Sequence, residues 1–159
     1  MIKKLEQKNN GFVLLFTIII LTVVLTVTFG VLDNALKQLN FATSASSSNE
    51  AFYAASVGAE CALFNDKSFS FSFLQNGSSG QVACLGTNIL FSASTASSWS
   101  FVLPGLGSNA QACSVVTVVK DFSVLPVSTI IDSRGFNFGD ISCNSAASHR
   151  VERALLLNY

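Results

Sequence analysis

The dominant pattern in the chain is an uninterrupted apolar stretch at residues 12–32. Its 21 residues carry no charge, and sixteen of them are Leu, Ile, Val or Phe, the others being four threonines and Gly30. At about 1.5 Å rise per residue, a helix of this length covers roughly 30 Å, which is the thickness of the hydrocarbon core of a bilayer. We therefore predict a transmembrane helix over residues 12–32.

Helix-favouring residues continue without a proline to about residue 64. Residues 42–48 contain only Ala, Thr and Ser, a composition that either unwinds a helix or permits close helix packing, and both alternatives stay open. We predict that the helix continues over residues 33–64 and ends at 65–67. An apolar stripe at three- and four-residue spacing comprises Leu32, Leu36, Leu39, Phe52, Ala55, Ala59 and Leu63.

Beyond the helix the apolar positions change to a two-residue period, which is typical of strands. Residues 69–73 and 81–85 are expected to form a hairpin around a turn at residues 76–80. Pro104 and Gly105 are expected to end a strand at 99–103. Further strands are predicted at residues 113–120, 129–131 and 150–159. This order predicts an α+β fold in which the outer half of a long N-terminal helix packs on a small antiparallel sheet.

Charge is sparse and unevenly distributed. Only 11% of the residues are charged and the net charge is zero, whereas soluble domains have about 25% charged residues. Residues 1–11 carry a net charge of +2 from three lysines and Glu6, and the rest of the chain carries −2 from six basic and eight acidic residues. The positive-inside rule places the N-terminus in the cytoplasm and residues 33–159 outside. A faintly acidic exported part argues against a nucleic acid as partner.

An ordinary cleaved secretory signal fits the apolar stretch less well than a retained anchor. The apolar core of such a signal is about 7 to 15 residues long and is followed closely by small residues. Here the core is longer, and the nearest small-residue site, at residues 43–45, lies about a dozen residues too far along the chain. We therefore expect the apolar helix to stay attached to the exported part.

The cysteines indicate disulfides rather than a metal site. Their number is even, all four lie on the expected outer side, and no Cys-x-x-Cys pair occurs. Two disulfides in an oxidising compartment would contribute about 2–4 kcal/mol each, and four buried free thiols are the alternative. Of the three possible pairings, local loop closure favours Cys61 with Cys84 and Cys113 with Cys143.

The junction before the apolar stretch carries a resemblance to a known family. Residues 8–16 read Lys-Asn-Asn-Gly-Phe-Val-Leu-Leu-Phe, which resembles the leader junction of type IV pilins and pseudopilins. Residues 50–60 are similar to a stretch of PilX-type minor pilins. The resemblance implies a pilin-like fold with a leader at 1–11, a transmembrane helix at 12–32, its continuation at 33–64 and an exported β-rich domain at 65–159.

The same resemblance implies a processing step and partners. Prepilin peptidase would cleave between Gly11 and Phe12 and methylate the new amino group of Phe12. Other pilin or pseudopilin subunits would pack against the N-terminal helix in a filament. Most members carry a glutamate at the fifth mature position, where it docks a neighbouring subunit, whereas this chain has Phe16. That departure implies a minor subunit, placed at the tip of the filament or priming its assembly.

The sequence offers no catalytic constellation and implies no cofactor. His149 is the only histidine, and one histidine without partners forms neither a metal site nor a nucleophile relay. We therefore expect a structural subunit rather than an enzyme, and a pilus, a secretion pseudopilus and a DNA-uptake filament all stay open as its machine. The alternative function is a single-pass anchored adhesion domain that does not polymerise. Residues 92–98 and 104–112 are the candidate recognition loops.

Overall fold

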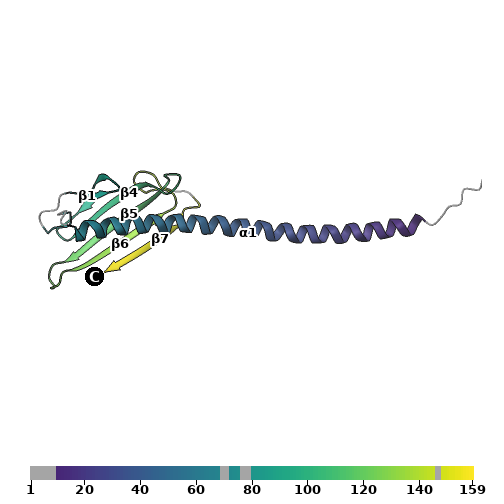
Figure 1. Ribbon diagram of the computed structural model, residues 1–159, viewed down its shortest axis with the longest axis horizontal. Helices are drawn as coiled ribbons and strands as arrows, with labels where there is room; N and C mark the ends of the chain where they lie inside the picture. The colour runs from purple at the N-terminus through teal and green to yellow at the C-terminus, as the bar shows by residue number, and fades with distance from the viewer. Residues whose placement is uncertain (1–9, 69–71, 76–79, 146–147) are drawn as a thin grey trace, which may run out of the picture. The chain divides into compact units, whose positions relative to one another are not determined.

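A computed structural model describes residues 10–68, 72–75, 80–145 and 148–159 (Figure 1). The chain divides into two compact units, Met1–Thr43 and Ser44–Tyr159, and the helix α1 (Asn10–Lys67) contributes to both. Residues 42–48 are helical throughout, so the alternative in which this segment unwinds is wrong. The expected leader residues 1–9, the phenylalanines at 69 and 71, and the turn residues 76–79 lie outside the described residues.

The strands of the described chain form two antiparallel sheets after the helix. A two-stranded sheet pairs β1 with β2, and a five-stranded sheet has the order β3-β4-β5-β6-β7. The strands are β1 (Gln81–Cys84), β2 (Thr87–Leu90), β3 (Ala93–Ser94), β4 (Ser98–Leu106), β5 (Ala112–Asp121), β6 (Ser128–Phe136) and β7 (Glu152–Asn158). The predicted α+β class, a long N-terminal helix with a small antiparallel sheet, is therefore confirmed.

The predicted hairpin between residues 69–73 and 81–85 is wrong, because the strand at 81–84 pairs with a different segment. Residues 72 and 73 form a turn, and β1 pairs with β2 instead. The connection is two residues long, with Leu85 at φ 51° and Gly86 at φ 75°. Two successive positive φ values match the tight turn that best suits the twist of a hairpin. The sequence pattern concealed this turn because leucine seldom occupies such a position.

Two other strands are longer than predicted. Pro104 and Gly105 lie inside β4 instead of ending it. The register with β5 shifts between Leu103 and Leu106. Such an irregularity tolerates Pro104, which has no backbone N–H to donate to the neighbouring strand. The β6 strand continues past residue 131 to Phe136. Consequently residues 104–106 belong to a strand and not to the predicted loop at 104–112. The predicted loop at 92–98 likewise contains β3 and the first residue of β4.

Within the unit Ser44–Tyr159, α1 presents a face of small residues to the centre of the sheet. This face replaces part of the predicted stripe, since Phe52 is 46% exposed while Ala55 and Ala59 are buried. A Cβ atom added at Gly58 would lie 2.5 Å from the hydroxyls of Ser114 and Ser133. Backbone and small side chains therefore meet directly. The buried members of the face are Ala51, Ala54, Ala55, Gly58, Ala59 and Ala62.

Large aromatic side chains fill the space beside this close contact. Trp99 and Phe101, on β4, are 1% and 0% exposed, and Phe73 lies 5.7 Å from Trp99 between ring centroids. Phe91 contacts Phe73 at 5.8 Å. The core is thus asymmetric, with small residues over β5 and β6 and aromatic residues towards β4. Burial of each aromatic side chain contributes about 1.5–3 kcal/mol.

Candidate functional site

The apolar part of α1 has the chemistry of a membrane-spanning segment. Among the described residues, one helix is long and apolar enough to cross a membrane, and its apolar window is 0% buried. The hydroxyls of Thr17, Thr22 and Thr26 each donate a hydrogen bond of 2.8 Å to the carbonyl three residues earlier. Because these donors are satisfied within the helix, the threonines can lie in hydrocarbon without an unpaired hydroxyl.

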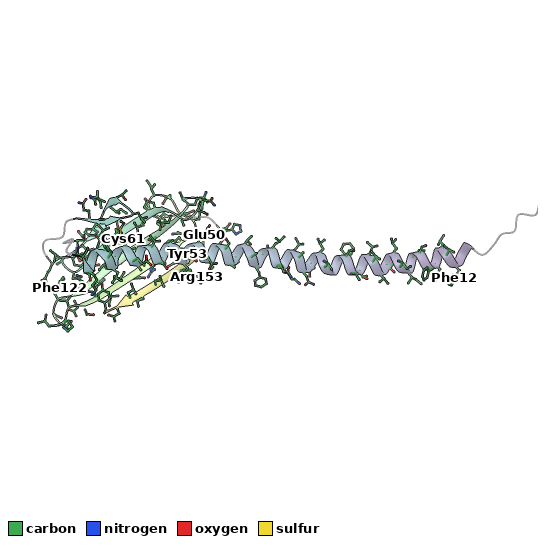
Figure 2. All side chains as sticks on the ribbon, viewed as in Figure 1. Phe12, Glu50, Tyr53, Cys61, Phe122 and Arg153 are labelled. Atoms are coloured by element: carbon green, nitrogen blue, oxygen red, sulfur yellow. A yellow bond between two sulfur atoms is a disulfide. The ribbon has the colours of Figure 1, made fainter. Side chains whose placement is uncertain are left out.

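The predicted processing junction lies at the start of this helix. α1 begins at Asn10, and no atom outside the helix lies within 4 Å of the place where a Cβ of Gly11 would stand. Phe12 is 75% exposed, and Figure 2 shows it at the beginning of the ribbon. No acidic side chain occurs in the first turn. An ammonium group created at Phe12 would therefore face the positive end of the helix dipole without a local counter-charge.

Phe16 occupies the position at which the family resemblance leads us to expect a glutamate. Its side chain is 54% exposed, and the residues from 10 to 32 carry no charge. The first acidic residue along the helix is Asp33, whose carboxylate accepts a hydrogen bond of 2.8 Å from Lys37. This segment therefore offers apolar contact but no carboxylate to a neighbouring helix.

The stretch that resembles minor pilins, residues 50–60, is the part of α1 that contacts the sheet most closely. The hydroxyl of Ser133 donates a 2.7 Å hydrogen bond to the carbonyl of Ala55. Gly135, on β6, faces the backbone of Ala51 and Ala55 so closely that no side chain fits between them. The physical role of this stretch is to bring the helix onto β5 and β6. Figure 2 labels Glu50 and Tyr53 in the same stretch, and the Tyr53 side chain is 67% exposed.

Two disulfides close the sheet unit. Cys61 bonds to Cys84 and Cys113 to Cys143, each with 5.7 Å between Cα atoms, and these are the pairings that local loop closure favoured. The first joins α1 to β1. The second joins β5 to the segment between β6 and β7, where Cys143 is 1% exposed. No cysteine of the chain is left as a free thiol.

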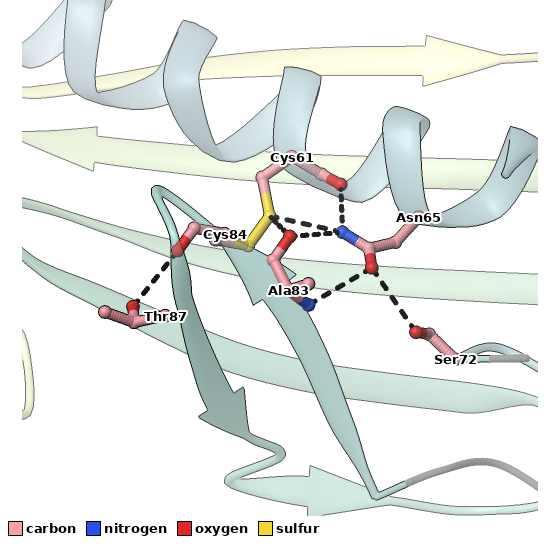
Figure 3. The surroundings of a disulfide bond; sticks show 6 residues. All are labelled: Cys61, Asn65, Ser72, Ala83, Cys84 and Thr87. Carbon is pink, nitrogen blue, oxygen red and sulfur yellow. Dashed lines mark hydrogen bonds between the residues drawn. A yellow bond between two sulfur atoms is a disulfide. The ribbon is translucent and has the colours of Figure 1, made fainter. Parts of the chain in front are cut away.

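Asn65 reinforces the first disulfide by bridging α1 and β1 (Figure 3). Its amide nitrogen donates 2.9 Å hydrogen bonds to the carbonyls of Cys61 and Ala83. Its amide oxygen accepts from the N–H of Ala83 at 3.2 Å and from the hydroxyl of Ser72 at 3.4 Å. From the sequence, Asn65 was expected only to mark the end of the helix. Its side chain in fact satisfies both backbone groups of one residue in β1.

The end of α1 also binds the last residue of the chain. Asp66 forms an ion pair with Lys120 of β5 and accepts a 2.8 Å hydrogen bond from the hydroxyl of Tyr159. The Lys67 ammonium lies 3.9 Å from the centre of the Tyr159 ring. Burial, followed by the hydrogen bond to Asp66 and its negative charge, raises the pKa of the Tyr159 hydroxyl above its usual value.

The other candidate residues from the sequence, His149 and the second candidate loop, form no site in the described part of the chain. His149 is exposed, and no group of three metal-ligating side chains occurs in the described part of the chain. Residues 107–111, the part of the second candidate loop outside strands, are also exposed. The close packing at Gly58 and Gly135 was not predicted, although a glycine within a helix or strand is a recognised sign of close backbone approach. Comparison of the chain with protein-family models, with curated proteins and with solved structures finds no match.

Proposed function

We propose that this chain is a minor subunit of a type IV pilus-like filament, held in the membrane by residues 12–32 until it is incorporated. The observation that carries the proposal is the dual use of α1. Its first part exposes apolar side chains and no charge, and its last part forms one wall of a disulfide-linked α+β unit. A single helix of this kind suits both storage in lipid and packing among the helices of other subunits.

Exposure along the apolar segment supports the same proposal. Its large side chains, from Phe12 to Leu32, are between 46% and 75% exposed, so within the described residues no other segment covers them. Lipid covers such a helix in the membrane, and neighbouring subunits would cover it in a filament. The disulfides are consistent with an oxidising compartment for the sheet unit.

Processing between Gly11 and Phe12 is the direct test. The structure offers a matched pair of variants, because an added Cβ meets nothing within 4 Å at either Gly11 or Gly30. We expect Gly11→Val to leave the chain uncleaved, and Gly30→Val to be cleaved and N-methylated like the unmodified chain. Mass spectrometry of the N-terminal peptide shows whether each variant is cleaved and whether Phe12 is methylated. An intact Met1 in the unmodified chain would instead support the anchored adhesion domain.

Phe16 supports a position at the tip. A subunit without the docking glutamate supplies no counter-charge to the ammonium of an earlier subunit. The first subunit of a filament has no earlier subunit to neutralise, so it does not need that glutamate. Phe16→Glu should therefore move the protein from the tip to the shaft, as seen by immunogold labelling. Ile20→Glu, one helical turn further on, costs a similar ~3 kcal/mol on insertion but should not relocate the protein. An unchanged position for Phe16→Glu would contradict the tip assignment.

A further inference from the structure

The side chains of Asp66 and Lys120 form a buried pair that joins the end of α1 to β5. They are 5% and 14% exposed, and the Lys120 ammonium contacts Oδ1 of Asp66. By contrast, the side chains of the Asp33–Lys37 pair are 68% and 66% exposed. Removing two opposite charges from water costs free energy, which their attraction offsets only with good geometry and further hydrogen bonds. A reaction that removes both charges of the buried pair therefore relieves this cost.

The two oxygens of the Asp66 carboxylate have different surroundings. Oδ1 is buried and accepts no hydrogen bond from the described residues, so its contact with Nζ of Lys120 is an ion pair without the angles of a hydrogen bond. Oδ2 accepts a 2.8 Å hydrogen bond from the hydroxyl of Tyr159. The carboxyl group is thus held between a nitrogen on one side and a hydrogen-bond donor on the other. Reacting groups held in contact in this way behave as parts of one molecule, which lowers the barrier to their reaction.

A cavity of about 160 Å³ lies beside the pair. Its lining includes Asp66 and Lys120 together with the apolar side chains of Phe73 and Leu74. The hydroxyl of Ser68, also in the lining, forms no hydrogen bond with any described residue. A cavity of this size is large enough for a water molecule, and a polar group in its wall can bind one. A water molecule released at the pair therefore has a place to go.

We propose that the side chains of Asp66 and Lys120 condense to an amide that links α1 covalently to β5. A proton first passes from the ammonium to Oδ1, which leaves an amine beside a carboxylic acid. Nζ then attacks the carboxyl carbon Cγ, so that a C–N bond forms and negative charge moves to Oδ2, where the Tyr159 hydroxyl stabilises it. A second proton passes from Nζ to Oδ1, the Cγ–Oδ1 bond breaks and water leaves. The net change is the loss of one water molecule, without an oxidant or any other reactant.

The amide complements the first disulfide. The Cys61–Cys84 bond joins α1 to β1, whereas the amide joins α1 to β5 and resists reduction. Helix and sheet then stay connected when the disulfides are reduced. The inference goes beyond the proposed function and does not depend on it, because the mass of the N-terminal peptide tests processing separately.

Mass spectrometry of the full-length chain, purified in detergent and then reduced and alkylated, tests the amide. Trypsin cleaves after free lysines, so an uncondensed chain gives the separate peptides 38–67 and 68–120. Trypsin does not cleave after a lysine whose side chain is an amide. We therefore expect peptide 38–67 to remain joined to peptide 68–134 after reduction, with a joint mass lower by one water molecule. Separate peptides 38–67 and 68–120 would overturn the proposal, because the pair would then still be ionic.

Two controls show whether the loss of water belongs to this pair. Lys120→Arg keeps the positive charge but replaces the amine by a guanidinium that stays protonated, so the variant should have its full mass and give separate peptides. A variant that still lacks one water molecule would place the reaction elsewhere in the chain and overturn the proposal. The exposed Asp33–Lys37 pair is the control within the same molecule, and trypsin should cleave after Lys37.

The role of Tyr159 is tested by the rate at which the amide forms. Burial raises the pKa of its hydroxyl, which keeps the proton that stabilises Oδ2. Loss of one such donor slows comparable reactions roughly hundredfold, so Tyr159→Phe should accumulate joined peptides much more slowly in chains sampled at increasing times after synthesis. Equal rates in the variant and the unmodified chain would overturn this role.

Discussion

The close approach of α1 to β6 predicts that one added methyl group at Gly135 disrupts the sheet unit. A Cβ there would lie well inside 3.0 Å of the carbonyl oxygen of Ala51 and the nitrogen of Ala55, whereas ordinary contacts are 3.4–4 Å. Both neighbours are backbone atoms of a helix, so the whole helix or the strand has to move. Such a movement also weakens the 2.7 Å hydrogen bond from Ser133 to Ala55.

The expected loss of stability follows from these two effects. Overpacking costs about 1–3 kcal/mol, towards the upper end where backbone has to shift, and a lost hydrogen bond adds about 1 kcal/mol. We therefore expect Gly135→Ala to lower the free energy of unfolding by about 3–4 kcal/mol. For a unit of this size, 1 kcal/mol corresponds to about 3–5 °C, so Tm should fall by roughly 10–20 °C.

Thermal unfolding of the full-length chain in detergent, followed by near-ultraviolet circular dichroism, measures this effect. Gly30→Ala adds the same methyl group to open space and should leave the transition of the sheet unit unchanged. Gly58→Ala should be milder than Gly135→Ala, because its neighbours are side chains, among them Val116 at 2.7 Å, that can rotate away. A Tm for Gly135→Ala within about 2 °C of the unmodified chain would refute the close approach.

Three further predictions concern the linkage of helix and sheet. Replacing both cysteines of the first disulfide by alanine should lower stability by about 3.4 kcal/mol in denaturant titration, from its sequence separation of 23 residues; an unchanged midpoint would contradict this. Asn65→Ala leaves both backbone groups of Ala83 without their side-chain partner and should cost about 2–4 kcal/mol in the same titration, so a cost below about 0.5 kcal/mol would argue against the bridge. Since burial, and then Asp66, raise the pKa of Tyr159 above 10.0, this hydroxyl contributes stability below pH 10 that is lost as the pH rises further. An absorbance titration of the Tyr53→Phe variant should therefore place the midpoint above 10.0, and a midpoint at or below 10.0 would contradict it.

The helix and the fold class could be predicted because they follow from long, strongly patterned segments. Residues 12–32 lack charge altogether, and the run of valines in β5 favours a strand whatever surrounds it. The disulfide pairing was also accessible, because short loops close more readily than long ones. These features depend on local sequence and on chain entropy.

The positions that sequence analysis missed depend on tertiary contact. The end of β6 was predicted too early because Ser133 and Gly135 have little preference for strands, yet small residues there are what allow α1 to approach. The buried stripe was misplaced at Phe52 for a related reason. The predicted stripe followed apolar residues at helical spacing and placed Phe52 beside Ala55 and Ala59, whereas the face of α1 closest to β5 and β6 consists of alanines and Gly58.

The central claim is that the chain leaves the membrane as a processed subunit of a filament. The most direct measurement is the intact mass of this chain recovered from filaments sheared from cells of its source organism. We predict a chain that begins with an N-methylated Phe12 and has both disulfides formed. A chain that begins at Met1 and stays in the membrane fraction would contradict it.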